Sequence, residues 1–384
     1  MKNRSNNSIE PLFTCVIPTY RRIKLIQKLL ESLSVAKEKV RKPIEIIIVD
    51  DTPSPEDKEV QDLCSTFKAI YLRGTSSVRE KRNLGITNAK GEYVLFIDSD
   101  CQASEDLFIE HYKSLSSSTY EACIGVTKFV GKDSLMWQII SHTKFIDSFN
   151  FPVLLQGKVE SAPWGPTSNL SVRKDVLTQI GGFETQLPFK LGADDADLGL
   201  RINASGYRIG MNSNAIVYHS KETWSNVRSI AKRVFRWGRM DYYLFYKRHV
   251  KQTFMTLPKP INYFYVVLAF NLLLALRFSL VYSSLAVLWL LSYFLLLAYI
   301  TKRHLKSDTR LVVLAASEIL NFLFDIGCSI ESLKHGSFSF LYREPIDDPR
   351  NLWWKKIHEA WAALISTFIN LVLFVLWSTF LLIF

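Results

Sequence analysis

Short apolar runs alternate with amphipathic segments along the N-terminal part of the chain. The runs are rich in β-branched residues, and the segments between them repeat apolar positions at helical spacing, as residues 23–33 do. Continuous runs of this kind are typical of strands buried on both faces, and their alternation with helices predicts βαβ units around a parallel sheet. The four expected strands are Leu12–Pro18, Ile44–Asp50, Phe67–Leu72 and Tyr93–Asp98.

A different pattern occupies the C-terminal part. Residues 261–300 contain a single charge, Arg277, and residues 360–384 contain none. A helix that spans a membrane needs about 20 predominantly apolar residues. We therefore expect three spans, at 261–278, 282–300 and 360–384.

Residues 311–333 are apolar but two-faced. Polar side chains fall on one face of the expected helix and apolar side chains on the other; the polar ones are Glu318, Asn321, Asp325 and Ser329. This pattern predicts an amphipathic helix that lies in the membrane interface rather than crossing it. The basic loops 301–310 and 334–356 then lie on one side, which the positive-inside rule makes the cytoplasm. We expect a multi-pass protein of the plasma (inner) membrane with its soluble N-terminal domain in the cytoplasm.

Basic and aromatic residues alternate just before the first expected span. Residues 232–259 hold eight Lys or Arg residues and one acid, Asp241. Such a stretch can bind nucleic acid. Because it continues directly into an apolar segment, we interpret it as an anchor at anionic lipid headgroups and expect no nucleic-acid partner. The expected domains are a soluble domain at 1–240, this juxtamembrane segment at 241–260 and a membrane region at 261–384.

Composition narrows the function classes. The 384 residues carry a formal net charge of +11 and five cysteines, with no CxxC pair among them. That spacing argues against a disulfide framework and against a zinc site. The two common phosphate-loop fingerprints are absent, and the polar N-terminus predicts no cleaved signal peptide.

Polar, chemically capable residues follow three of the expected strands. They are Thr19-Tyr20-Arg21, Asp50-Asp51 and Asp98-Ser99-Asp100. Ligands of parallel sheets bind at the carboxyl ends of the strands, so these groups should converge at one edge. Asp98 and Asp100 can both reach one hard cation, although the same spacing also occurs in ordinary polar loops. Asp50-Asp51 can hydrogen-bond a ribose or base, or can simply form a turn.

A second acidic cluster, Asp194, Asp195 and Asp197, opens a later helix. Acids are favoured at helix N-termini, and capping explains part of the cluster. Three acids in four positions exceed what capping needs, so one carboxylate can serve as a general base toward a hydroxyl acceptor.

Several basic residues and one histidine have two interpretations each. Arg79, Lys81 and Arg82 can contact phosphate, but we expect at least one of them on a solvated helix face. His219 can ligate the metal or be structural. Arg236 and Trp237 can bind a pyrophosphate and stack on an acceptor ring, or can anchor the chain at lipid.

The order of the motifs resembles glycosyltransferase family 2, which has the nucleotide-sugar-binding GT-A fold. The matching pieces run from residue 12 to about residue 240: VIPTYRR, IIIVDD, REKRNLGI, GEYVLFIDSD, SNLSVRKDVLTQIGGFE, GADDADLGLR, GYRI and VYH. The resemblance implies an α/β domain with a Rossmann-like, mixed and mostly parallel sheet, followed here by an α-helical membrane region. It also implies inverting transfer of a sugar from a nucleoside diphosphate.

The resemblance assigns roles by position. Pro18, Thr19 and Tyr20 would frame the base, with Asp50 or Asp51 on the base or ribose. Asp98 and Asp100 match the DxD motif, with Asp100 the preferred ligand of Mg²⁺ or Mn²⁺, Asp98 beside the diphosphate or ribose, and His219 a further candidate ligand. Arg82 would contact the donor. Asp194-Asp195 matches the acidic pair of the family, which is usually Glu-Asp, and makes Asp195 the general base.

The stretch Arg233-Val-Phe-Arg236-Trp237 is similar to the Q-x-x-R-W motif of processive members such as cellulose synthases. Arg233 replaces the Gln, which leaves processivity open, while Arg236 and Trp237 would line the acceptor or diphosphate site. Three spans are few for a wide channel, so a processive enzyme would need self-association or a partner subunit.

The leading hypothesis is a membrane-bound hexosyltransferase that uses a nucleoside-diphosphate sugar, with a UDP-sugar the expected donor. Its acceptor would be lipid-linked or a glycan, for polysaccharide or glycolipid biosynthesis. One alternative is a polyprenyl-phosphate sugar synthase, which needs no strong base. An alternative of another class is a non-catalytic subunit that binds a nucleotide sugar in an assembly.

Overall fold

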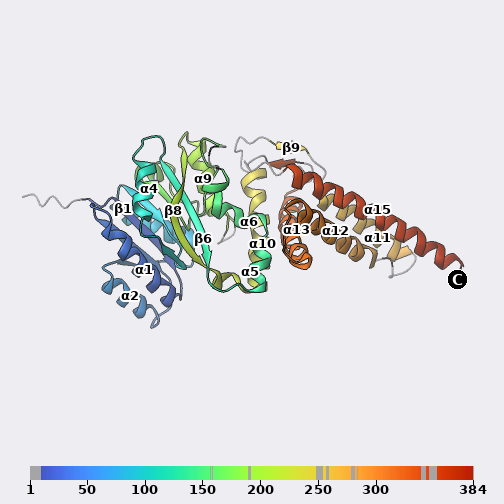
Figure 1. Cartoon of the computed structure of the whole chain (residues 1–384), viewed down its shortest axis with the longest axis horizontal. Helices are drawn as coiled ribbons and strands as arrows, with labels where there is room; N and C mark the ends of the chain where they lie inside the picture. The colour runs from blue at the N-terminus through green and yellow to red at the C-terminus, as the bar shows by residue number, and fades with distance from the viewer. Residues whose placement is uncertain are drawn as a thin grey trace, which may run out of the picture. The chain divides into compact units, whose positions relative to one another are not determined.

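The computed structural model describes residues 10–155, 157, 159–188, 192–247, 254–256, 259–277, 282, 284–338, 343–345 and 353–383. The chain divides into two compact units (Figure 1). The first comprises residues 1–134 and 146–225, and the second comprises residues 135–145 and 226–384. The expected boundary at residue 240 therefore differs from the division found here, because the helix at 227–241 belongs to the second unit.

An eight-stranded sheet organises the first unit, in the order β3-β2-β1-β4-β7-β6-β8-β5. The strands are β1 (Phe13–Thr19), β2 (Ile44–Asp50), β3 (Ile70–Arg73), β4 (Tyr93–Phe96), β5 (Cys101–Ala103), β6 (Ala122–Val130), β7 (Leu170–Arg173) and β8 (Ile209–Ser220). Strands β1 to β4 correspond to the four runs expected from the sequence. The pairs β1–β2, β2–β3, β1–β4 and β6–β8 are parallel, whereas β7 and β5 run antiparallel to their neighbours. The mixed, mostly parallel sheet confirms the predicted fold class.

Helices cover both faces of this sheet. They are α1 (Ile23–Glu38), α2 (Asp57–Thr66), α3 (Val78–Asn88), α4 (Leu107–Leu115), α7 (Phe151–Leu154), α8 (Lys174–Gln179) and α9 (Asp194–Ala204), with short helical turns at Ser148–Asn150 and Lys221–Trp224. Cys15 and Ile17 of β1 lie in one apolar core with α1, while Val16 lies in the other with α3. Burial on both sides is the reason that β1 reads as an unbroken apolar run.

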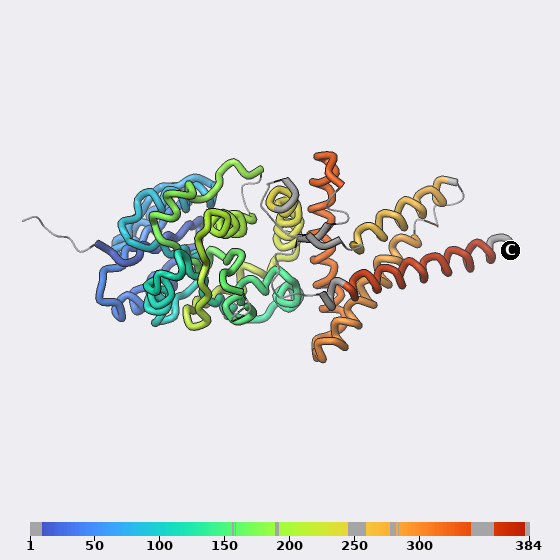
Figure 2. The backbone as a smooth tube through the Cα atoms, turned by 90° about the horizontal axis from the view of Figure 1, so that it is seen from above, coloured from blue at the N-terminus to red at the C-terminus, as the bar shows by residue number. Residues whose placement is uncertain are grey.

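Among its described residues, the second unit is helical apart from one small two-stranded sheet. Its elements are α5 (Leu135–Ile140), α10 (Val227–Asp241), a π-helix (Tyr242–Lys247), α11 (Pro260–Arg277), α12 (Ser284–His304), α13 (Leu311–Lys334) and α15 (Trp353–Ile383), with β9 (Phe254–Thr256) paired to β10 (Arg343–Pro345). The short helix α6 (Lys144–Asp147) lies where the two units divide. Helices α11, α12 and α15 pack together, and α13 runs crosswise to them (Figure 2).

Three helices are long and apolar enough to cross a membrane: α12, α13 and residues 357–380 of α15. Among the described residues α11 is shorter, with its apolar part at Pro260–Leu276. This set differs from the expected one, since it includes α13 and leaves out α11. Mean hydropathy does not distinguish a two-faced helix from a uniformly apolar one, so the interfacial placement of α13 stays a prediction.

Two glycines bring α10 and α13 into close contact. A Cβ at Gly238 would lie 1.9 Å from the Phe324 carbonyl oxygen, and one at Gly327 would lie 2.3 Å from the Phe235 carbonyl oxygen. The polar face of α13 is covered in the second unit, with Glu318, Asn321 and Ser329 all buried. Glu331 accepts hydrogen bonds from Arg239 Nε at 2.6 Å and from the Tyr243 hydroxyl at 2.8 Å.

Candidate active site

The strand directions bring the predicted chemistry to one edge of the sheet. Strands β1, β2 and β4 are parallel, and β8 shares their direction because β4, β7 and β6 alternate and β6 is parallel to β8. Thr19, Asp50 and His219 lie at the carboxyl ends of their strands, and Asp98 and Asp100 follow β4 directly. The expected convergence at this edge is therefore present.

Asp100 is buried and contacts two basic groups. Its Oδ2 lies 2.8 Å from Arg22 Nη1, and its Oδ1 lies 3.4 Å from His219 Nε2. Burial pushes the pKa of the Asp100 carboxyl upward, but His219 and Arg22 together hold it below its ordinary value, so the group is a carboxylate. Arg22 was not among the predicted site residues; its signal in the sequence is its place just after the first strand.

His219 is fixed by its own strand and by three aromatic rings. Its Nδ1 lies 3.1 Å from the carbonyl oxygen of Ser220, and its ring packs against Phe129, Phe149 and Trp224. If Nδ1 donates its proton to that carbonyl, Nε2 presents a lone pair to Asp100.

The pair Asp100–His219 fits a divalent cation. Asp100 Oδ1 is buried and accepts no hydrogen bond from any residue that the structure describes. An unpartnered carboxylate oxygen facing an imidazole nitrogen suits a metal ion that takes oxygen and nitrogen ligands. Cys101 Sγ lies within 4.8 Å of both groups, but burial raises the pKa of this thiol well above its ordinary value, and a protonated thiol is a poor ligand.

One guanidinium joins the two acidic clusters. Arg82 Nη2 lies 3.2 Å from Asp98 Oδ1, and Arg82 Nη1 contacts Asp194 Oδ2. Asp194 also accepts a hydrogen bond from the backbone N–H of Gly192 at 3.2 Å. Residues far apart in the chain, after β4 and at the start of α9, are thus connected through a side chain of α3.

The Asp195 carboxyl is more basic than an ordinary aspartate. Burial and the neighbouring Asp194 carboxylate raise its pKa to about 7, with Arg82 acting in the opposite direction. Its Oδ1 accepts a hydrogen bond from the backbone N–H of Ala196, at 3.0 Å. A partly exposed carboxyl with a pKa near neutrality suits a general base. Asp197 is instead explained by its ion pair with Arg201 at 2.9 Å, so it is structural.

The groups predicted to frame a base differ in accessibility. Pro18 and Thr19 are buried within β1, whereas Tyr20 is 48% exposed. Asp50 is fully buried and accepts hydrogen bonds from the hydroxyls of Thr52 at 2.7 Å and Tyr71 at 3.4 Å. Asp51 is partly exposed and pairs with Lys81. Tyr20 and Asp51 are therefore better placed than Asp50 to contact a ligand.

The expectation of a solvated basic face on α3 is wrong. Arg79, Lys81 and Arg82 are all buried, because each reaches a partner on a neighbouring segment. Lys81 joins the Thr19 carbonyl to Asp51, and Arg79 Nη2 donates to the Gly192 carbonyl at 2.9 Å.

Residues 14–183 match the model of the family described as glycosyl transferase family 2. This part of the chain is a family 2 glycosyltransferase domain. The match covers β1 to β7 and confirms the family resemblance over these residues, while the motifs of residues 192–219 lie beyond the matched range.

Curated relatives of the family 2 domain are glycosyltransferases. The chain is 21% identical over 265 residues to the glycosyltransferase AglE of Haloferax volcanii, covering 66% of this chain and 84% of that protein. It is 25% identical over 227 residues to the succinoglycan biosynthesis protein ExoM of Rhizobium meliloti, covering 57% and 71%. A further match is local: the chain spans only 14% of an uncharacterized glycosyltransferase of Rickettsia felis, at 34% identity over 87 residues.

Among solved structures, the chain is similar to a mannosyltransferase of Pyrobaculum calidifontis in complex with GDP-Man and Mn²⁺. The identity is 18% and the TM-score 0.47, with 94% of this chain and 88% of that chain covered.

The predicted acceptor residues lie outside the family 2 domain. Arg233, Arg236 and Trp237 belong to α10 of the second unit, where the Trp237 ring packs 5.4 Å from the ring of Phe145. Their role toward an acceptor or a diphosphate stays a prediction.

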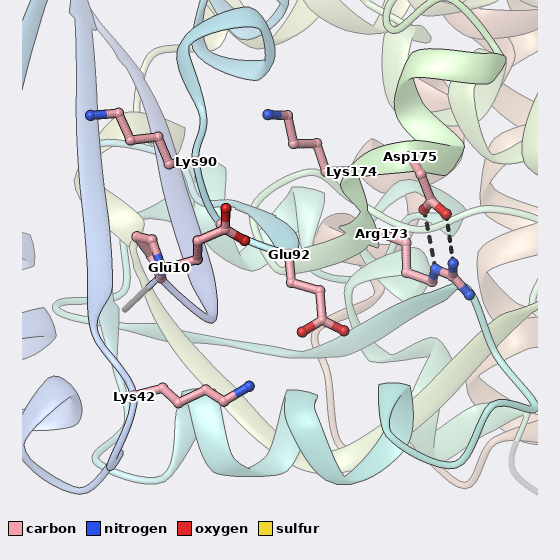
Figure 3. Close-up of a pocket in the computed structure, with 9 residues that line it drawn as sticks. Glu10, Lys42, Lys90, Glu92, Arg173, Lys174 and Asp175 are labelled. Carbon is pink, nitrogen blue, oxygen red and sulfur yellow. Dashed lines mark hydrogen bonds and ion pairs between the residues drawn. The ribbon is translucent and has the colours of Figure 1, made fainter. Parts of the chain in front are cut away.

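A hollow also lies at the opposite edge of the family 2 domain, where β1, β2 and β4 begin (Figure 3). It is lined by Glu10, Pro11, Lys42, Lys90, Gly91, Glu92, Arg173, Lys174 and Asp175. Arg173 and Asp175 form an exposed ion pair there, at 2.6 Å. None of the predicted site residues lines this hollow, and ligands of such sheets bind at the other edge.

Proposed function

We propose that the chain is a membrane-bound inverting glycosyltransferase that moves a sugar from a nucleoside-diphosphate donor to a lipid-linked or polysaccharide acceptor. The observation that carries the proposal is the meeting of Asp98, Asp100, Asp194 and Asp195 at the carboxyl edge of a family 2 domain. Transfer from a nucleotide sugar needs both a cation site for the diphosphate and a base for the acceptor.

The base and the donor groups have separate tasks in this proposal. Tyr20 and Asp51 contact the nucleoside. Asp195 takes the proton of the acceptor hydroxyl as the acceptor oxygen forms its bond to the anomeric carbon. The bond from that carbon to the diphosphate breaks with its electron pair on the diphosphate oxygen. A single displacement of this kind inverts the configuration at the anomeric carbon.

Asp100 and His219 would hold a Mg²⁺ or Mn²⁺ ion, with Asp98 beside the diphosphate. When bound, such an ion neutralises charge on the leaving diphosphate. The unpartnered Oδ1 of Asp100, 3.4 Å from His219 Nε2, supports this assignment.

The helical unit supports a membrane-linked product. Three helices are apolar and long enough to cross a membrane, and the basic residues of α10 precede them in the chain. The relative ExoM carries a name from succinoglycan biosynthesis, which is in line with a role in polysaccharide assembly. We propose an inner-membrane location with the family 2 domain in the cytoplasm.

The test is nucleoside-diphosphate release by the detergent-purified full chain. UDP-, GDP- and dTDP-sugars are each supplied with Mg²⁺, Mn²⁺ or EDTA, together with lipid extract as a source of acceptor. We expect metal-dependent release from one donor, and its loss in Asp195→Asn with donor binding retained. Turnover that survives in Asp195→Asn would favour a phosphate acceptor, as in a polyprenyl-phosphate sugar synthase. Absence of nucleotide binding in the wild type would overturn the proposal.

A further inference from the structure

Arg82 occupies a central position between the acidic groups of the site. Its side chain is 5% exposed, and its two terminal nitrogens contact carboxylates on different segments, Asp98 and Asp194. The guanidinium carbon lies 5.3 Å from the centre of the Phe183 ring, which packs against its face. An arginine that binds a phosphate presents its nitrogens as an open fork, and here both terminal nitrogens already have partners within the protein.

The contact between Arg82 and Asp194 bears on the proposed base, because Asp195 is the next residue in the chain. Asp194 accepts from the N–H of Gly192 through its second oxygen, so its carboxylate connects Arg82 to the turn before α9. Ala193 in that turn has a φ of +57°, a left-handed conformation that is uncommon for a residue with a Cβ. A strained turn persists only where its surroundings hold it, and Asp195 comes two residues after it.

Arg79, which lies one helical turn before Arg82 on α3, contacts the same loop segment before α9. Its Nη2 donates to the carbonyl of Gly192 at 2.9 Å, and its side chain is almost fully buried. Arg79 and Arg82 therefore contact the turn through its backbone and through Asp194, respectively.

We infer that Arg82 is a positioning residue, which fixes the Asp194 turn and thereby the orientation of the base Asp195, and which does not bind the donor diphosphate. This inference rests on the proposed function and assigns Arg82 a role other than donor contact. Asp98 is held by the same guanidinium, so the diphosphate side of the site and the base side share one support.

The experiment compares Arg82→Gln and Arg82→Lys with the wild type in donor affinity, measured by calorimetry, and in kcat and KM for nucleoside-diphosphate release. In Arg82→Gln we expect kcat to fall by about 100-fold, as for a small displacement of a reacting group, with donor affinity falling less than tenfold, since only the contact with Asp98 concerns the donor side. Arg82→Lys keeps the charge but can reach only one carboxylate, so it should recover part of kcat. Arg173→Gln is the matched control, because it breaks an exposed arginine–aspartate pair at the opposite edge (Figure 3).

A double-mutant cycle tests the path through Asp194. The losses of kcat in Arg82→Gln and Asp194→Asn should not add in the double variant, since both remove one contact. Thermal unfolding of each variant identifies any that fail to fold. If Arg82→Gln fails to fold, the donor affinity and kcat of Arg82→Lys decide whether Arg82 is a positioning residue or a donor ligand.

Donor affinity that falls tenfold or more in a folded Arg82 variant, with kcat retained, would overturn the inference and make Arg82 a donor ligand. Binding also separates this inference from the proposed function. If the wild type binds a nucleotide sugar without turnover, the catalytic proposal fails, while a less than tenfold loss of affinity in Arg82→Gln still excludes Arg82 as a donor ligand.

Discussion

The Nε2 atom of His219 lies 3.4 Å from Oδ1 of Asp100, an oxygen that accepts no hydrogen bond from any residue the structure describes. Asp100 directly precedes β5, whose first residue, Cys101, is the register partner of His219 on β8. Strand pairing thus fixes the distance between Asp100 and His219, and the backbone N–H of Ser220 donates to the Asp100 carbonyl at 2.9 Å. A cation between the two side chains would satisfy both.

We predict that Asp100→Asn and His219→Gln each weaken Mn²⁺ binding by about tenfold or more, because each removes or weakens one ligand. The measurement is the electron paramagnetic resonance signal of free Mn²⁺ during titration of the purified protein, which requires no turnover. Cys101→Ser is the control and should bind Mn²⁺ as the wild type does, since carboxylate and imidazole ligands suit this cation better than a thiol does. Equal Mn²⁺ affinity in His219→Gln and wild type would remove His219 from the site.

The convergence of the proposed metal and donor groups could be predicted from the sequence, because each group lies at the end of a strand or directly after one. Asp98, Asp100 and His219 are examples: their positions after apolar runs were enough to bring them together. The contacts of α3 could not be predicted in this way. Lys81 and Arg82 look like a solvated helix face in the sequence, and only the long-range packing of α3 against Asp51 and Asp194 buries them.

The same limit applies to α13. Its polar residues indicate a face that meets water or lipid headgroups, whereas Ser329 of this face is buried and contacts the hydroxyl of Tyr265 on α11. Periodicity shows that a helix has two faces but does not show which neighbour covers each face. Gly238 and Gly327, which bring α10 and α13 together, carry no periodic signal at all.

We predict that catalytic turnover rises with pH and levels off above about pH 7. The base must be ionised to accept a proton, and burial together with Asp194 raises the pKa of Asp195 to about 7. Below that value kcat should fall about tenfold per pH unit, because one protonation removes the base. The measurement is kcat at saturating donor from pH 5 to 9. A flat profile across pH 6 to 8 would contradict the role of Asp195.

The same raised pKa predicts a stability effect. A carboxyl that binds its proton more readily in the folded state than in the unfolded chain stabilises the fold at low pH. This contribution is complete below the ordinary aspartate pKa of about 4 and is lost as the pH rises through about 7. Asp195→Asn lacks this pH dependence, so it should gain thermal stability relative to the wild type between pH 5 and 8. The comparison uses melting temperatures of both proteins at several pH values, and a constant difference between them would contradict it.

Side chains at the crossing of α10 and α13 should be poorly tolerated. In Gly327→Ala the new Cβ would lie 2.3 Å from the Phe235 carbonyl oxygen, so the helices must separate. Overpacking of this kind costs about 1–3 kcal/mol of unfolding free energy. Thermal unfolding in detergent measures the loss, and Ile319→Ala, whose side chain is 48% exposed on the same helix, is the control. A Gly327→Ala protein as stable as the control would contradict the close packing.

The placement of α13 in the membrane can be decided by label depth. Val312, Ile319, Ile326 and Leu333 lie seven residues apart on α13, about two turns each, and therefore share one face of the helix. Each position is changed to Cys in a background that lacks the five native cysteines, which are all buried, and carries a spin label in liposomes. If α13 lies in the interface, as its crosswise direction relative to α11, α12 and α15 favours (Figure 2), the four labels have similar depths.

If α13 instead crosses the bilayer, the depth changes by about 10 Å from each label to the next, from a rise of about 1.5 Å per residue. At each position, the depth is measured by comparing the accessibility of the spin label to a water-soluble nickel reagent with its accessibility to oxygen. A steady gradient across the four positions would overturn the interfacial assignment and would place the basic loops 301–310 and 334–356 on opposite sides, against the positive-inside rule. The family 2 domain would then share its side with only one of these loops, and the topology proposed for the chain would change with it.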